Sequence, residues 1–184
     1  STLFFTVNRL PSLFVLLHAP ITGGPAAAIS RGVSAHSLQV SPDGAQLVIS
    51  NSNAVITLPV LGGVPVVITE SVSNPLVRIS PDSRTLFFIT HPSSPQLVSA
   101  PIEGGPLRNL SGTIEPRANL GPGLLLDPQG SWVGFLAADE RLFAVPADGS
   151  RAPQLVNESS DLVLDFVLGR RHVFYSAANR GDSL

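Results

Sequence analysis

The 184-residue chain carries 13 acidic side chains and 11 basic ones, all of them arginine, for a formal net charge of −2 at neutral pH. Charged residues make up only 13% of the chain and hydrophobic residues 43%, a composition that excludes an intrinsically disordered protein. The arginines are scattered, so we expect no nucleic-acid partner, and a chain without cysteine has neither disulfides nor thiolate metal sites.

Short strand-like segments separated by turn residues run along the whole chain. The chain opens on one of them, residues 2–6, which resembles the later segment 85–90. We therefore expect the chain to begin inside a repeating unit. No segment shows the 3.6-residue periodicity of a helix, and no apolar run approaches the ~20 residues of a membrane-spanning helix. We expect strands throughout and no membrane span.

Two turn motifs recur along the chain with similar spacing. The first motif is Ser-Pro-Asp-Gly or a variant of it, and its prolines are Pro42, Pro81 and Pro128. A weakened copy of it ends at Gly169, which aligns with Gly130. The second motif is Pro-x-x-Gly-Gly or a variant, and its prolines are Pro20, Pro59, Pro101 and Pro146. Proline presets a tight turn and glycine tolerates a positive φ, so both motifs predict turns between strands.

The third repeat shows the pattern of one unit. Its strand-like segments are residues 76–79, 85–90, 96–102 and 107–110, all rich in β-branched, aliphatic or aromatic residues. We name them a, b, c and d. The Ser-Pro-Asp motif joins a to b, and the Pro-x-x-Gly-Gly motif joins c to d.

Four antiparallel strands repeating every ~40–45 residues are typical of a β-propeller blade. We therefore predict an all-β fold, a β-propeller of four-stranded antiparallel blades, with about four blades and 17 strands in this chain. The single domain, 1–184, divides into an incomplete blade at 1–30, blades at 31–70, 71–111 and 112–157, and an incomplete blade at 158–184.

The two terminal blades are both incomplete, because the first has strands b, c and d and the last has strands a and b. The last strand a would close a ring of about four blades within one chain, or a second copy would complete a ring of about eight. In a third arrangement the missing blades lie outside the given sequence. Unpaired sheet edges favour association. We therefore expect either a homodimer that completes a ring or missing blades.

Segments 41–69 and 80–111 carry Ser-Pro-Asp, a leucine three residues after the turn, and Gly-Gly before the last strand. This pattern resembles the WD-repeat-like blades of TolB-like propellers. The resemblance implies a non-enzymatic binding or scaffold module with a protein or peptide partner, in the periplasm or secreted. Similar blades also gate substrate access in prolyl-oligopeptidase-like hydrolases, so a propeller domain of a larger hydrolase is one alternative. An excised or engineered propeller fragment without independent function is the other.

Catalytic motifs are missing from the sequence. It contains no Gly-x-Ser-x-Gly, no His-Glu-x-x-His and no lysine. We therefore predict that the chain is not an enzyme and has no catalytic, cofactor-binding or metal-binding residues. Asp43 and Asp82 recur at blade spacing, and this repetition indicates structural turn residues.

Seven residues are candidates for ligand contacts on the channel or rim of the propeller. Strand a lines the channel of a propeller, and loops on a rigid scaffold often carry function. Strand a supplies three of them, the loops before or after strands supply two histidines, and the long connection 112–121 supplies two charged residues. They are Gln39, Arg78, Asp165, His36, His91, Glu115 and Arg117.

Overall fold

The computed structural model describes residues 2–10, 13–31, 37–51, 53–72, 76–90, 93–117, 123–157, 162–170 and 172–178. Strands, turns and bends account for the regular structure of these residues, and none of them is helical. Accordingly, this described part of the chain holds no helix of the length and apolarity that a membrane crossing requires.

The described residues form 17 strands in five antiparallel sheets. The first sheet contains β1 (Thr2–Leu10), β2 (Leu13–Pro20) and β3 (Ala27–Arg31). The second contains β4 (Ser37–Val40), β5 (Gln46–Ser50), β6 (Val55–Pro59) and β7 (Val66–Thr69). The third contains β8 (Arg78–Ile79), β9 (Thr85–Ile89), β10 (Leu97–Pro101) and β11 (Arg108–Asn109).

The fourth sheet contains β12 (Leu124–Leu126), β13 (Trp132–Leu136), β14 (Leu142–Pro146) and β15 (Gln154–Leu155). The fifth contains β16 (Leu162–Leu168) and β17 (Val173–Ala178). Within the three four-stranded sheets, consecutive strands are neighbours throughout, so each sheet is an up-and-down meander of the kind that builds a propeller blade.

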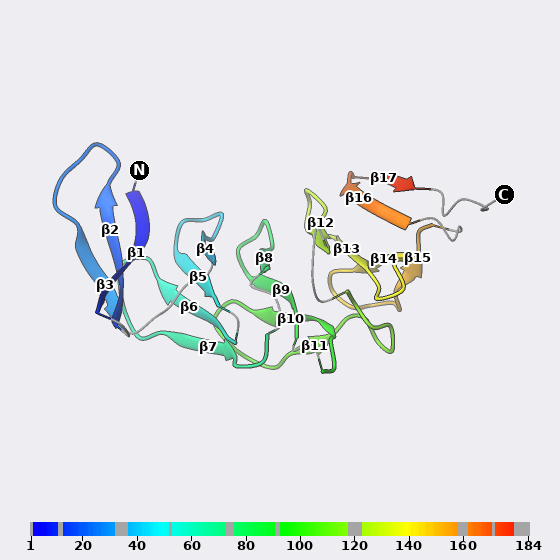
Figure 1. Cartoon of the computed structure of the whole chain (residues 1–184), viewed down its shortest axis with the longest axis horizontal. Helices are drawn as coiled ribbons and strands as arrows, with labels where there is room; N and C mark the ends of the chain where they lie inside the picture. Colours follow the sequence, from blue (N-terminus) through cyan, green and yellow to red (C-terminus); the bar gives the residue numbers. More distant parts are fainter. Residues whose placement is uncertain are drawn as a thin grey trace.

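The sheets stand side by side in an open row (Figure 1). The first strands of the complete sheets, such as β4 and β8, lie along one side of the row, and the last strands, such as β7 and β11, lie along the other. Strand β12 contacts both β8 and β16, so the first strands of successive sheets are neighbours in space. The predicted all-β fold of four-stranded antiparallel blades is confirmed, and the row is open, with β1 and β17 at opposite ends.

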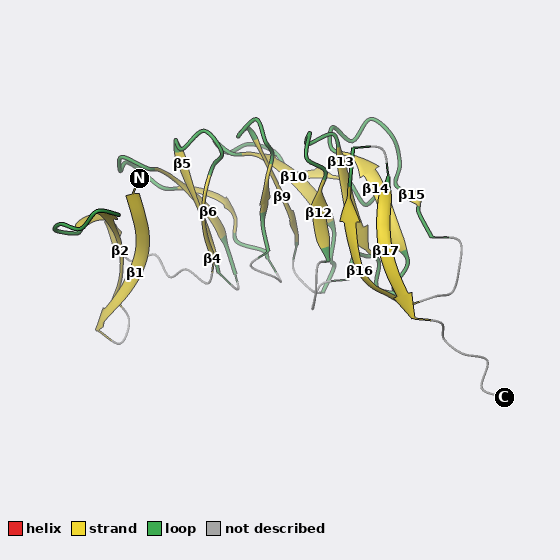
Figure 2. Cartoon of the chain, turned by 90° about the horizontal axis from the view of Figure 1, so that it is seen from above, coloured by secondary structure: helices red, strands yellow, loops and turns green. Residues whose placement is uncertain are grey.

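The connections lie on two edges of the row (Figure 2). The turns between strands a and b and between strands c and d share one edge, which we name the turn rim. The described parts of the b–c loops and d–a connections, such as residues 93–96 and 112–117, lie at the opposite edge, which we name the loop rim. This separation follows from the antiparallel order of each sheet, because every second connection returns to the same edge.

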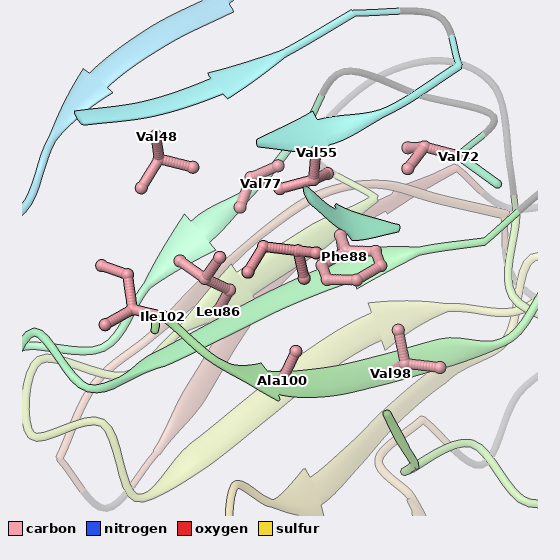
Figure 3. Close-up of a cluster of buried hydrophobic side chains, with 10 residues drawn as sticks. Val48, Val55, Val72, Val77, Leu86, Phe88, Val98, Ala100 and Ile102 are labelled. Atoms are coloured by element: carbon pink, nitrogen blue, oxygen red, sulfur yellow. The ribbon is translucent and has the colours of Figure 1, made fainter. Parts of the chain in front are cut away.

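The hydrophobic core lies between the sheets. In the largest cluster, Val48 and Val55 of the second sheet pack against strands β9 and β10 of the third (Figure 3). At the next interface, Phe87 of the third sheet packs against Val133 and Phe135 of the fourth. Successive residues of a strand point to opposite faces, so each central sheet buries one set of side chains against the sheet before it and another against the sheet after it.

The last a–b turn differs from the predicted alignment. In the earlier turns, the hydrogen bond that closes the turn runs from Ser80 N–H to the Thr85 carbonyl, at 2.8 Å, and from Asp127 N–H to the Trp132 carbonyl, at 3.0 Å. In the last turn, Gly169 N–H donates to the His172 carbonyl at 2.8 Å. Gly169 therefore occupies the place of Ser80 and Asp127, and its predicted alignment with Gly130 is wrong because this turn is two residues shorter.

Candidate functional site

The polar residues predicted on strand a lie at separate places along the row. Gln39 joins two blades, because its side-chain Nε2 donates to the carbonyl of Val77, beside β8, at 3.0 Å. Arg78 occupies the equivalent position one sheet later, where it is half-buried, and burial lowers the pKa of its guanidinium. Asp165 is exposed on β16 and accepts the N–H of Phe166 at 2.8 Å. Strand β12 lies between β8 and β16, so Arg78 and Asp165 do not form a common site.

The predicted histidines His36 and His91 lie outside the described residues. The two described histidines stand beside aromatic rings: the His18 ring is 6.3 Å from that of Phe4, and the His172 ring is 6.2 Å from that of Phe174. Within the described ranges, no three side chains of the metal-ligating types gather into a site for a metal ion.

Glu115 and Arg117 lie on the loop rim, in the connection that leads from the third sheet into the fourth. Their backbone extends along the end of β13: Arg117 N–H donates to the Leu136 carbonyl at 2.8 Å, and the Glu115 carbonyl accepts the N–H of Ala138 at 2.8 Å. The Arg117 guanidinium is 4.0 Å from a carboxylate oxygen of Glu140. Backbone pairing therefore fixes this stretch of the connection, and the Glu115 side chain is exposed.

A pocket of about 410 Å³ lies beside Glu115 on the loop rim. One wall is the b–c loop of the third sheet, residues 93–96, and the other is the start of the d–a connection, residues 112–115. We name this hollow the rim pocket. The length of the d–a connection pointed to the second wall. The first wall belongs to the b–c loop that begins at the candidate His91, and its signal in the sequence is a polar break between two strands.

The first wall of the rim pocket is held by the side chain of Thr90. Its Oγ1 accepts the N–H of Gln96 at 3.0 Å and donates to the carbonyl of Ser94 at 3.2 Å. The Thr90 N–H also donates to the Gln96 carbonyl at 3.0 Å. One threonine at the end of β9 thus closes the loop that forms this wall.

The second wall is held by Asn109 and Ser111, at the end of the third sheet. The Asn109 side chain accepts the Gly112 N–H at 3.0 Å and donates to the Gly112 carbonyl at 3.1 Å. The buried Ser111 hydroxyl donates to Asn109 Oδ1 at 3.2 Å and accepts the N–H of Leu97 at 3.2 Å. These bonds fasten the connection to β10, so both walls are preorganised.

The lining of the rim pocket suits an extended polar chain. Hydroxyls and an amide line it at Ser93, Ser94, Gln96 and Thr113, and Glu115 adds one carboxylate. Pro95 and Ile114 contribute apolar surface. Hydrogen-bonding groups beside small apolar surfaces recognise a peptide backbone and its side chains, and the carboxylate favours a basic side chain in the ligand.

The aspartates of the Ser-Pro-Asp motif accept hydrogen bonds within the a–b turns of the turn rim, which is the structural role predicted for them. Asp43 Oδ1 accepts the hydroxyl of Ser41 at 2.5 Å and the N–H of Ala45 at 3.0 Å. These two bonds hold the pKa of the Asp43 carboxyl below its ordinary value. The Ser80 hydroxyl and the Arg84 N–H have the same effect on the pKa of Asp82. Because these carboxylates are already bonded within their own turns, their role is structural.

No family model and no curated protein matches the sequence. Solved structures do match the fold. An uncharacterized protein of Listeria monocytogenes, lmo1340, superimposes with a TM-score of 0.62 at 11% identity, over 91% of this chain and 52% of that one. TolB from Acinetobacter baumannii gives 0.57 at 15% identity, over 85% and 41%. A putative TolB from Agrobacterium tumefaciens gives 0.52 at 21% identity, over 80% and 57%.

These similarities show a TolB-like propeller fold. The chain spans about half the length of each of these three structures.

Proposed function

We propose that this chain is a non-enzymatic binding module that recognises a peptide or an extended segment of another protein at the rim pocket. The observation that carries the proposal is the pocket itself, which has two walls fixed by side-chain hydrogen bonds and a lining of hydroxyls, one amide and one carboxylate. A rigid scaffold that presents preorganised loops lowers the entropic cost of binding.

The TolB-like fold supports the same proposal. The resemblance of the repeats to TolB-like propellers implies binding of other proteins, and it favours a periplasmic or secreted site of action. The proposed module comprises the whole single domain, 1–184. The pocket contacts we propose include Glu115, and the N–H of Arg117 holds the adjacent backbone by donating to the Leu136 carbonyl.

Selection of a displayed random-peptide library on the immobilised chain tests this function. We expect selected peptides to carry a basic residue and to bind Thr113→Trp at least about tenfold more weakly than the parent chain, because the indole fills the pocket. Glu115→Gln should weaken peptides with a basic residue by about threefold to tenfold, since it removes one partly exposed charge contact.

Leu61→Trp is the matched control, because Leu61 is fully exposed on the turn rim. This variant should bind the selected peptides as the parent chain does. Selected peptides that bind Thr113→Trp and the parent chain equally would show that the rim pocket is not the recognition site. Selection that yields no saturable peptide binder would contradict the binding function itself.

A further inference from the structure

The contact between neighbouring sheets follows one rule, set by the middle residue of strand b. Val48 of β5 and Phe87 of β9 hold this position, and each is 1% exposed because it packs on the next sheet. In β13 the position is Gly134, where a Cβ would meet Phe166 and Leu168 of the next sheet. Val48 lies against Leu86 and Phe88. A sheet therefore offers its middle residue to the following sheet, and it receives the preceding sheet on the residues that flank that position.

Phe174 of β17 holds the same position in the last sheet. It lies two residues after the carbonyl that closes the a–b turn, as Phe87 does, and it pairs with Val167 as Phe87 pairs with Arg78. Phe174 is 65% exposed and Val167 is 59% exposed. Cross-strand partners share a face of the sheet. Phe174 and Val167 thus form an apolar face at the place where the repeat puts a contact between sheets.

The other half of this contact lies at the opposite end of the row (Figure 1). In the first sheet, Phe4 packs against the second sheet, so the adjacent Phe5 belongs to the outward face. Phe5 is half-buried and pairs with Leu17, which is 6% exposed, just as Phe88 pairs with Val98 in the third sheet. Phe88 and Val98 belong to the cluster that receives Val48. Phe5 and Leu17 therefore hold the receiving positions.

We propose that the face of Phe174 and Val167 binds the face of Phe5 and Leu17 on a second copy of this chain. The occupant is a second copy because the chain holds both halves of an interface that it already uses between its own sheets. The halves lie at opposite ends of the row, so one chain in this open form does not join them to each other (Figure 1). The contact is head to tail, and it closes into a ring or continues into a longer series according to the curvature of the row.

The surroundings of Phe174 fit a partner of this kind. Phe174 also lines a hollow of about 590 Å³ on the turn rim, together with His172 and the a–b turn residues Gln129, Gly169 and Arg170. Leu164, which is 56% exposed, adds further apolar surface on β16. Exposed apolar side chains gathered on one surface are typical of a site that receives a protein partner.

Molar mass measured by light scattering during size-exclusion chromatography tests the proposal. One chain has a mass of 19.2 kDa, and we expect the observed mass to rise above this value as the concentration increases. Phe174→Glu and Phe5→Glu should each remain at the mass of one chain, since each loses one half of the contact. An equimolar mixture of the two variants keeps one intact half on each partner and should form a complex of two chains.

Leu61→Glu is the control, because it places the same charge on a fully exposed leucine of the turn rim and should leave association unchanged. A parent chain that stays at 19.2 kDa at every concentration overturns the proposal. It is also overturned if Phe5→Glu, with a circular dichroism spectrum like that of the parent, still associates, because the Phe174 face would then bind another copy of itself.

Cysteine crosslinking provides a second readout that does not depend on introduced charge. The chain has no cysteine, so Phe5→Cys and Phe174→Cys each introduce a unique thiol. A mixture of the two variants should form a disulfide between different variants far faster than either variant forms one with itself. Equal rates would contradict the head-to-tail contact. Peptide binding at the rim pocket should be the same in all these variants, which separates this test from that of the proposed function.

Discussion

The a–b turns of the third and fourth sheets use different side chains to accept the same two backbone N–H groups. In the third, the Ser80 hydroxyl accepts the N–H of Thr85 at 2.8 Å, and Asp82 accepts that of Arg84 at 3.1 Å. In the fourth, Asp127 alone accepts both equivalent amides, from Ser131 at 2.6 Å and Trp132 at 2.7 Å.

The turn therefore needs two acceptors, and one carboxylate in the first position replaces a hydroxyl in the first position and a carboxylate in the third. Asp127 is only 2% exposed, whereas the Asp82 carboxylate stands at the surface. Gln129 is free to differ from the motif because Asp127 already satisfies both donors. The apparent loss of the motif in the fourth unit is therefore a substitution that keeps its physical role.

Replacing Asp127 should have the largest effect on stability of any substitution in the two turns. Asp127→Ala leaves two amides without acceptors and should lower the free energy of unfolding by about 2–3 kcal/mol, measured by urea denaturation. Asp127→Ser should recover part of this loss, and adding Gln129→Asp should recover more by rebuilding the Ser-Pro-Asp pattern. A double variant no more stable than Asp127→Ala would show that the two solutions are not interchangeable.

The fourth residue of the motif also differs between the two turns: it is Ser83 in the third sheet and Gly130 in the fourth. Both adopt positive φ, +63° at Ser83 and +72° at Gly130. A Cβ at Gly130 would lie 2.6 Å from Cδ of Pro81, so Gly130→Ser should lower the free energy of unfolding by about 2 kcal/mol. Ser83→Gly should change it by less than about 1 kcal/mol, because the relieved strain offsets the lost bond from Asp43 N–H. Equal losses in thermal or urea unfolding would contradict this asymmetry.

The serine of the third turn should matter less than Asp127. Ser80→Ala removes the acceptor for Thr85 N–H and leaves Asp82 in place for Arg84 N–H, so we expect a loss of about 1 kcal/mol in urea denaturation. Ser80→Thr, which keeps the hydroxyl, is the control. A loss as large as that of Asp127→Ala would mean that the third turn depends on its serine alone.

Acid should weaken the third turn slightly through Asp82. The pKa of Asp82 lies below its ordinary value of 3.8 because the Ser80 hydroxyl and the Arg84 N–H bond the carboxylate. The contribution of a group with a lowered folded pKa is present above the unfolded value, about pH 4, and is lost as the pH falls through the folded pKa. Urea midpoints of the parent chain and Asp82→Asn should therefore differ near neutral pH and converge in stronger acid. A difference unchanged by acid would assign the effect to hydrogen bonding alone.

Much of the fold is predictable from the sequence because its turns recur at regular spacing. The prediction of strand c at 96–102 compares with Leu97–Pro101 in the structure, and the pairing order within each complete sheet follows the prediction. The predicted alignment of Gly169 with Gly130 is wrong because the last turn is two residues shorter than the others. Matching the glycines of successive repeats does not reveal this difference in length. The closing hydrogen bond of the turn identifies the equivalent residues correctly.

The rim pocket was predictable only in part. The length of the d–a connection indicated Glu115 and Arg117, and the candidate His91 begins the loop that contains the facing wall, residues 93–96, about twenty residues earlier. Its position depends on Thr90, and the side chains of Asn109 and Ser111 hold the opposite wall. Bonds of this kind depend on three-dimensional placement, so a turn motif alone does not reveal them.

The most direct test of the account is to map a selected peptide by changes in the amide chemical shifts of the labelled chain. Binding at the rim pocket predicts the largest changes in residues 93–96 and 112–117, with little change in the turn-rim residues 41–46 and 80–85. Changes concentrated on the turn rim or on residues 162–178 would contradict recognition at the rim pocket.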